Sequence, residues 1–112
     1  MPEPLPEEID IEAAAALLNA EESPRWIDCR ELDEWHICRI PGAELLPLSR
    51  FVEEAPRKLA DPAQRFIVYC HHGVRSLNAT RWLRQRGFGR AQSLRGGIDL
   101  WAELIDPEMR RY

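Results

Sequence analysis

The feature that most constrains the fold is a buried-strand pattern that ends at a cysteine and is followed at once by a polar loop and a helix. Residues 65–70, RFIVYC, contain a continuous run of β-branched and aromatic side chains. Such a run is typical of a strand that is covered on both faces in a parallel sheet. The loop after Cys70 is short, and residues from about 76 to 86 have the apolar spacing of a helix. The segment therefore predicts a strand, a loop and a helix in immediate succession.

Weaker signals of the same alternation run along the rest of the chain. Strands are expected at residues 25–28, 44–48 and 91–94. Helices are expected at residues 10–20, where Asp10 is the N-cap, at 31–36 and at 98–104. A further helix is expected from about residue 49, with Phe51, Val52 and Ala55 facing inward and a break or kink near Pro56. Alternating strands and helices predict an α/β fold, a small central parallel sheet with helices on both faces. Ligands in such sheets gather at the carboxyl ends of strands, where Cys70 is expected.

Length and charge restrict the domain count and the partners. The chain has 112 residues, 45% of them hydrophobic, which suits one domain. We expect a flexible N-terminal arm over residues 1–8 and a domain over residues 9–112. A net charge of -4 without a dominant basic run argues against nucleic-acid binding. No apolar run reaches the roughly 18 residues of a membrane span, and the acidic, proline-rich start is unlike a signal peptide, so a cytoplasmic protein without a membrane partner is expected.

The three cysteines have no zinc-binding spacing, and free thiols are the expectation for a reducing compartment. Cys29 falls within a predicted strand and is expected to be core packing. Cys38 is expected in a surface turn, either as an ordinary residue or as a thiol that resolves an oxidised Cys70. No metal site is expected, because the chain has neither a helical histidine pair nor a Cys-x-x-Cys motif.

The loop CHHGVRS, residues 70–76, combines features that favour an ionised thiol. A loop between a strand and a helix can turn its backbone N–H groups inward around an anion, and the start of the helix adds its positive dipole end. Gly73 allows the tight curl. N–H donors and Arg75 favour the thiolate of Cys70, which is the nucleophilic form, and Ser76 can cap the helix or hydrogen-bond the sulfur.

The length of the loop indicates the size of the group that it can surround. Four residues separate Cys70 from Arg75, one fewer than in the Cys-x5-Arg loop of cysteine phosphatases, which surrounds a phosphate. The shorter loop suits a smaller group, such as one sulfur atom carried on the cysteine. A small phosphatase or arsenate reductase is the alternative that this length disfavours.

Other polar and aromatic residues have two interpretations each. His71 and His72 either attract anions, in a pH-dependent way because imidazole titrates near neutrality, or are ordinary loop residues. Asp28 and Arg30 end a predicted strand on the site's side, where they either brace the loop, with Asp28 pairing Arg75, or form a structural ion pair. Core positions are expected for Trp35, Trp82 and Trp101.

Three blocks together resemble the single-domain rhodaneses, the thiosulfate sulfurtransferases. They are WIDCRELDEWHICRIPGA at residues 26–43, CHHGVRS at 70–76 and LRGGIDLWAE at 94–103, in the family's order and spacing. The chain departs from the family at Cys38-Arg39, where Gly-His is usual, and at Cys29, where valine is usual. The resemblance implies a rhodanese-like domain.

The resemblance also implies a mechanism and site residues. Cys70 is the nucleophile that takes sulfane sulfur as a persulfide, and His71, His72, Gly73, Val74, Arg75 and Ser76 bind the substrate, with Asp28 and Arg30 in support. The implied partners are a small anionic donor such as thiosulfate and a thiol or protein acceptor, with no cofactor. A non-enzymatic interaction module or a persulfide carrier for a protein partner remains the alternative.

Overall fold

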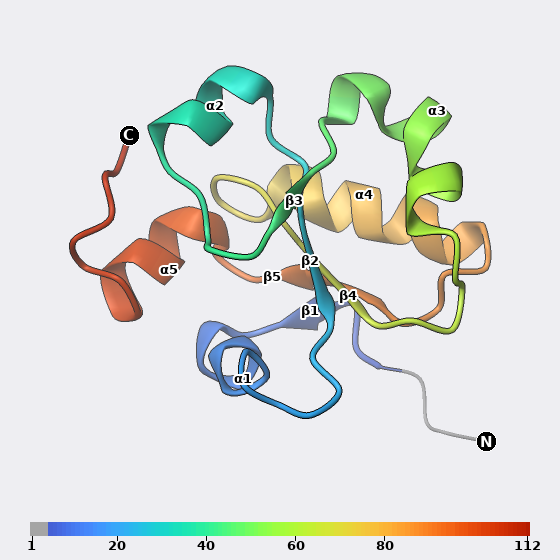
Figure 1. Ribbon diagram of the computed structural model, residues 1–112, viewed down its shortest axis with the longest axis horizontal. Helices are drawn as coiled ribbons and strands as arrows, with labels where there is room; N and C mark the ends of the chain where they lie inside the picture. The colour runs from blue at the N-terminus through green and yellow to red at the C-terminus, as the bar shows by residue number, and fades with distance from the viewer. Residues whose placement is uncertain (1–4) are drawn as a thin grey trace.

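A five-stranded parallel sheet forms the centre of the protein, as seen in a computed structural model that describes residues 5–112 (Figure 1). The strand order is β1-β5-β4-β2-β3. The elements follow the chain as β1 (Glu8–Ile9), α1 (Ile11–Ala16), β2 (Arg25–Asp28), α2 (Leu32–Ile37), β3 (Glu44–Leu45), α3 (Leu48–Leu59), β4 (Phe66–Tyr69), α4 (Val74–Gln85), β5 (Ala91–Leu94) and α5 (Gly97–Leu104). The predicted α/β class with a parallel sheet is confirmed.

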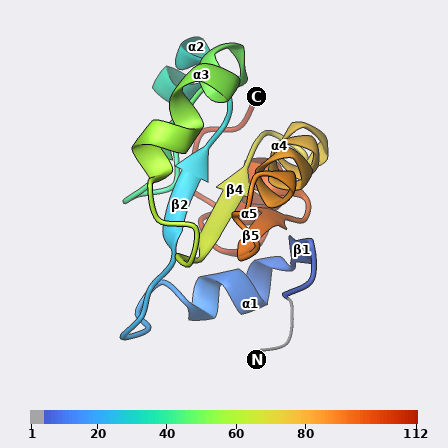
Figure 2. The same ribbon diagram turned by 90° about the vertical axis from the view of Figure 1, so that its right-hand side faces the viewer.

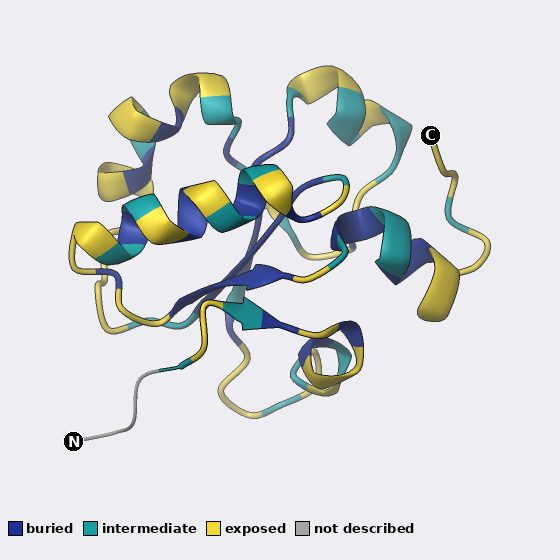
Figure 3. Cartoon of the chain, turned by 180° about the vertical axis from the view of Figure 1, so that it is seen from behind, coloured by how far each residue is buried: buried dark blue, intermediate teal, exposed yellow. Residues whose placement is uncertain are grey.

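Helices cover both faces of this sheet (Figure 2). Helices α3 and α4 pack on one face, where the side chains of Phe51 and Leu83 meet alternate residues of β2 and β4. Helices α1 and α5 pack on the other face through residues such as Ile11 and Trp101. All four residues of β4 are buried because the strand lies between β2 and β5 and is covered on both sides (Figure 3). The hydrophobic run RFIVYC therefore becomes the central strand.

Several details differ from the sequence expectations. Helix α1 begins after the predicted cap Asp10, whose carboxylate accepts from the Ala13 N–H at 2.8 Å, but it ends at Ala16 rather than Ala20. Helix α3 continues through Pro56 without a break, because Phe51, Ala55 and Leu59 stay buried on the sheet across it. Val52, expected inward, is 64% exposed.

Of the three tryptophans expected in the core, Trp101 is buried, and Trp35 and Trp82 are only half-buried. Trp101 is buried against Trp26, with ring centroids 5.3 Å apart. Trp82 is half-buried and stacks under the Arg86 guanidinium, while Trp35 is half-buried under Arg39. Both lie on helices at the border of the core, where the ring is apolar on one side and meets a cation on the other.

Strand β1 was not expected, because two residues carry no readable pattern. It joins the sheet as Glu8 and Ile9 pair with β5. The arm expected over residues 1–8 falls partly on residues 1–4, which lie outside the described range. The Glu7 carbonyl accepts from the Ser93 N–H at 2.7 Å, and Glu7 pairs with Arg81, so the expected boundary at residue 9 cuts through β1. Among the described residues, no helix is both long and apolar enough to cross a membrane.

Candidate active site

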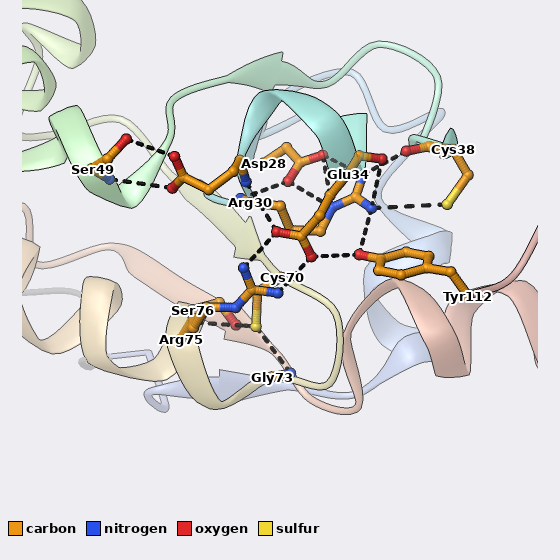
Figure 4. A network of polar contacts seen from close by, with 11 residues as sticks. Asp28, Arg30, Glu34, Cys38, Ser49, Cys70, Gly73, Arg75, Ser76 and Tyr112 are labelled. Carbon is orange, nitrogen blue, oxygen red and sulfur yellow. Dashed lines mark hydrogen bonds and ion pairs between the residues drawn. The ribbon is translucent and has the colours of Figure 1, made fainter. Parts of the chain in front are cut away.

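Cys70 lies at the carboxyl end of β4, where the chain leaves the sheet for the loop that leads into α4 (Figure 4). The residue is 1% exposed. Gly73 is the N-cap of α4 and has a φ of 100°, a left-handed conformation that residues with a side chain rarely adopt. A Cβ at this position would also press on the backbone of Leu94 and Gly96. The glycine thus lets the loop curl tightly beneath the first turn of the helix.

Two backbone N–H groups and one hydroxyl of the loop converge on the Cys70 sulfur. The Gly73 N–H lies 3.1 Å from Sγ and the Ser76 N–H 3.3 Å. The Ser76 hydroxyl lies 3.4 Å away; it accepts from the Cys70 thiol and donates to the thiolate, which has no proton of its own. The Ser76 and Ser93 hydroxyl oxygens are 2.7 Å apart, and both side chains are fully buried. When the Ser76 proton points to sulfur, Ser93 is the donor to Ser76. A chain of two buried hydroxyls thus ends at the sulfur and favours negative charge there.

A fourth donor comes from the neighbouring strand. The Cys29 thiol, at the end of β2, acts as a hydrogen-bond donor to the Cys70 sulfur and is the largest cause of a lowered Cys70 pKa. Together with the Ser76 and Gly73 donors it outweighs burial and brings that pKa to about 5. The same contact raises the pKa of Cys29, so the proton stays on Cys29. Cys70 is the anion of the pair because the loop N–H groups point at its sulfur.

Helix α5 holds the loop from the opposite side. The Ile98 N–H donates to the Cys70 carbonyl at 2.9 Å, and the Asp99 N–H donates to the His71 carbonyl at 3.1 Å. Gly97 lies so close beneath these two carbonyls that a Cβ there would overlap them. The glycine pair at the start of α5, Gly96 as N-cap and Gly97 as first residue, therefore brings the first N–H groups of the helix onto the backbone of the nucleophile.

Arg75 pairs with Glu34 of α2. Of the two interpretations of Asp28 and Arg30, the one that pairs Asp28 with Arg75 is wrong, and the structural ion pair between Asp28 and Arg30 is confirmed. The Arg75 guanidinium donates two hydrogen bonds of 2.7 Å to the two Glu34 oxygens (Figure 4). Hydrogen bonding to Arg75, helped by the Tyr112 hydroxyl, lowers the pKa of Glu34 to about 2. Such a two-pronged pair fixes orientation as well as charge. It ties the start of α4 to α2 across the mouth of the loop.

Asp28 instead pairs with Arg30, two residues away. The Arg30 guanidinium lies 2.7 Å from the Asp28 carboxylate, and both side chains are fully buried. Arg30 also donates to the Cys38 carbonyl at 2.6 Å and the Glu34 carbonyl at 3.2 Å, so it anchors the last turn of α2. Burial of this arginine is compensated because its donors find oxygen partners.

The side chains of the remaining loop residues have other contacts or face solvent. His71 stacks on the ring of Tyr112, with centroids 3.9 Å apart and planes 6° apart. His72 is exposed, with its Nε2 3.7 Å from Asp99, and Val74 is 70% exposed. His71, His72 and Asp99 offer ligand atoms within 4.8 Å of one another, but the Asp99 carboxylate already pairs with an arginine at 3.0 Å. The geometry therefore gives no ground for assigning a metal.

Sequence reasoning missed three residues of the site. Glu34 was hidden among several acids of one helical turn, and only the position of α2 singles it out. Cys29 packs in the core, as the sequence predicts, but its position beside the nucleophile is not part of that prediction; pairing of the strands that end near Asp28 and Cys70 could have indicated it. The Tyr112 hydroxyl donates to the Glu34 carboxylate at 2.7 Å. Because the two residues are 78 positions apart, no local sequence pattern predicts this contact.

Comparison with known proteins gives a consistent match. Residues 10–104 match the family model described as rhodanese-like domain. A sulfurtransferase of Allochromatium vinosum is 36% identical over 107 residues, covering 90% of this chain and 96% of the relative. The probable adenylyltransferase/sulfurtransferase MoeZ of Mycobacterium tuberculosis is 36% identical over 86 residues, which cover 77% of this chain but 22% of MoeZ.

The chain spans between 19% and 29% of the length of several such curated relatives, so it corresponds to one part of each. Among solved structures, a rhodanese-related protein of Thermoplasma volcanium superposes with a TM-score of 0.77 at 26% identity. That match covers 88% of this chain and 92% of the other, so most of the described fold has a counterpart.

Proposed function

The chain belongs to the rhodanese-like domain family, and we propose that it is a sulfurtransferase that carries sulfane sulfur as a persulfide on Cys70. The observation that supports this most is the ring of donors around one buried sulfur, from Gly73, Ser76 and Cys29. These donors hold Cys70 as a thiolate at neutral pH, which is the form that attacks a sulfur atom. The loop is fitted to a small anion rather than to a phosphate.

The proposed reaction has two displacement steps. The Cys70 thiolate attacks the outer sulfur of thiosulfate or of a protein persulfide, and sulfite or the donor thiolate leaves with the electron pair of the broken S–S bond. A second thiolate, or cyanide in an assay, then attacks the outer sulfur of the persulfide and restores the Cys70 thiolate. Kinetics of this kind are ping-pong.

Each surrounding residue has a proposed task in those steps. The Gly73 and Ser76 N–H groups stabilise the charge that moves between the two sulfur atoms, as an oxyanion hole does. Arg75, held by Glu34, places a cation at the mouth of the loop for an anionic donor, and exposed His72 adds a second polar contact there. The Asp28–Arg30 pair supports α2 and thereby the Glu34 carboxylate. A reducing compartment such as the cytoplasm, expected from the sequence, keeps the three cysteines free.

Intact-mass measurement tests the proposal directly. After thiosulfate treatment and removal of excess donor, the chain should gain the mass of one sulfur atom and lose it when cyanide is added, with one thiocyanate formed per chain. Cys70→Ser should gain nothing while keeping its fold, and Cys38→Ser should behave as the wild type. A Cys70→Ser variant that still produces thiocyanate at the wild-type rate would refute the proposal.

The same measurement identifies the donor. A persulfidated donor protein is compared with thiosulfate at equal sulfur concentration, and the ratio of the two loading rates is recorded. Faster loading from the protein would favour the alternative of a persulfide carrier for a protein partner. Faster loading from thiosulfate would favour a small anionic donor.

A further inference from the structure

Cys29 lies directly beside Cys70 on the neighbouring strand. The register of β2 and β4 pairs Ile27 with Val68 and Asp28 with Tyr69. The Cys29 N–H continues the ladder by donating to the Tyr69 carbonyl at 3.0 Å. Positions 29 and 70 are therefore opposite one another at the end of the sheet.

The two cysteine side chains project from the same face. Alternate residues of a strand point to opposite sides, and Cys29 and Cys70 belong to the cluster under α3 and α4 that also contains Ile27 and Val68. Neighbouring strands lie about 4.8 Å apart. A disulfide needs a Cα separation of about 4.4–6.8 Å, so the spacing of the strands suits one. Both thiols are free in the structure.

The mechanism does not require a thiol at position 29. Cys29 is fully buried, and the reactive group that the structure places beside it is the Cys70 sulfur. Any hydroxyl or amide would supply a hydrogen bond to the Cys70 sulfur, but of the common side chains only a thiol can also form a covalent bond with it.

We propose that Cys29 is the resolving thiol of Cys70 and forms an intramolecular disulfide with it when a hydroperoxide has oxidised the nucleophile. In the first step the Cys70 thiolate attacks the terminal oxygen of the hydroperoxide and an S–O bond forms as the O–O bond breaks. The sulfur is oxidised to sulfenic acid, and the peroxide is reduced to an alkoxide, or to hydroxide from hydrogen peroxide, which leaves with the electron pair and takes a proton from water. In the second step the Cys29 sulfur attacks the Cys70 sulfur, the S–O bond breaks, and the leaving hydroxide takes the Cys29 proton to form water. An external thiol reduces the disulfide and restores both residues.

Oxidation itself prepares Cys29 to attack. The contact with the Cys70 thiolate is the largest cause that keeps Cys29 protonated. A sulfenic acid carries no charge at neutral pH, so its formation removes the anion beside Cys29 and makes Cys29 easier to ionise. The disulfide protects the nucleophile from irreversible oxidation to sulfinic acid and stops its chemistry until a thiol resets it.

Cys38, which the sequence left open as an alternative resolving thiol, is not placed for that role. It is half-buried at the end of α2, with its sulfur 3.8 Å from the Arg30 guanidinium, and packs with the cluster on the other face of the sheet. The sheet therefore separates Cys38 from the face that carries Cys29 and Cys70. A link between Cys38 and Cys70 would need rearrangement of α2.

Peptide mapping of the peroxide-treated full chain tests the proposal. Trypsin places the cysteines in three different peptides, residues 26–30, 31–39 and 66–75. The reduced chain is treated with two equivalents of hydrogen peroxide, which is enough to carry an unresolved Cys70 through sulfenic to sulfinic acid. Free thiols are then blocked with N-ethylmaleimide, and the chain is digested without reductant. We expect the loss of two hydrogen atoms from the intact mass and a linked pair of peptides 26–30 and 66–75, both reversed by dithiothreitol.

Variants separate the resolving role from the hydrogen bond. Cys29→Ser keeps a donor toward Cys70 but has no thiol, so it should accumulate sulfinic acid on peptide 66–75 that dithiothreitol does not reverse. Cys38→Ser should form the same link as the wild type. The proposal is overturned if wild-type peptide 66–75 is recovered as sulfinic acid, linked to peptide 31–39, or linked between two chains. The test uses no sulfur donor, so its result is independent of sulfur transfer.

Discussion

Removal of the Ser76 hydroxyl should raise the pKa of Cys70. The sulfur accepts from the Cys29 thiol, the Ser76 hydroxyl and the N–H groups of Ser76 and Gly73, and these donors lower its pKa from 9.0 to about 5 against burial. If the net lowering is divided evenly over four donors, each supplies about one pH unit, or about 1.4 kcal/mol. Because burial opposes them, each donor is worth somewhat more. Ser76→Ala should therefore move the pKa to between roughly 6 and 7.

The pH dependence of alkylation measures this change. Only the thiolate reacts with iodoacetamide, so the rate at peptide 66–75 falls as pH decreases through the pKa of Cys70. The wild type should stay reactive down to about pH 5, and Ser76→Ala should lose reactivity at a higher pH. In urea both chains should return to the ordinary thiol range, because the donors are no longer held around the sulfur.

Ser93→Ala is the matched control. It removes a buried hydroxyl of the same size, 2.7 Å from the Ser76 oxygen, but leaves the Ser76 hydroxyl to donate to Cys70. Its effect on the pKa of Cys70 should be clearly smaller than that of Ser76→Ala. Its loss of folding stability should also be smaller, because Ser93→Ala leaves the Ser76 hydroxyl with its Cys70 partner, whereas Ser76→Ala removes the side-chain partner of the buried Ser93 hydroxyl. An unchanged midpoint in Ser76→Ala, or equal midpoints in the two variants, would contradict the assignment of Ser76 as a direct donor.

Three further predictions concern the polar network around the loop. Glu34→Gln should lower the free energy of unfolding in urea by about 1 kcal/mol, because it weakens the pair with Arg75. The difference from the wild type should shrink as the pH falls from 4.5 through about 2, because Glu34 itself becomes protonated in that range. A difference that stays constant down to pH 2 would contradict this. Arg30→Lys should lower the free energy of unfolding by about 3 kcal/mol in the same assay, because a lysine ammonium cannot replace the several buried N–H donors of the guanidinium. A loss smaller than that of Glu34→Gln would contradict this prediction. Tyr112→Phe should raise the pKa of Glu34 but keep the ring-current shift of His71 in NMR spectra, because the stacked ring stays and only the hydroxyl is lost; an unchanged Glu34 pKa would show that the hydroxyl contact is absent in solution.

The central strand and its loop were predictable because their signals are local. An apolar β-branched run before Cys70 and a glycine three residues later fix the strand, the turn and the helix start from neighbouring residues alone. Val52 was misplaced for the opposite reason. A helix of twelve residues has one buried stripe, and which stripe it is depends on the angle at which α3 lies on the sheet.

The ion pairs of the site could not be predicted from the sequence. Arg75 has several acids within reach in principle, and its choice of Glu34 over Asp28 follows from where α2 lies relative to α4. Asp28 was unavailable because Arg30, two residues away, folds back onto it within the buried interior. Pairing between nearby residues on one strand end competes with pairing across the fold, and sequence separation alone does not decide between them.

The three residues from Asp28 to Arg30 serve both sides of the sheet, which explains how a short strand end can control the whole loop. Alternation along β2 turns Cys29 toward the Cys70 sulfur, while the two charged residues turn the other way and pair with one another. Arg30 then fixes the backbone of α2 at Glu34, and Glu34 fixes Arg75 at the start of α4. We propose that Asp28 supports the loop indirectly, through Arg30 and α2, because it does not contact Arg75. A substitution at Asp28 should disturb the position of Arg75 and leave the Cys29 contact largely intact, whereas a substitution at Cys29 should do the reverse.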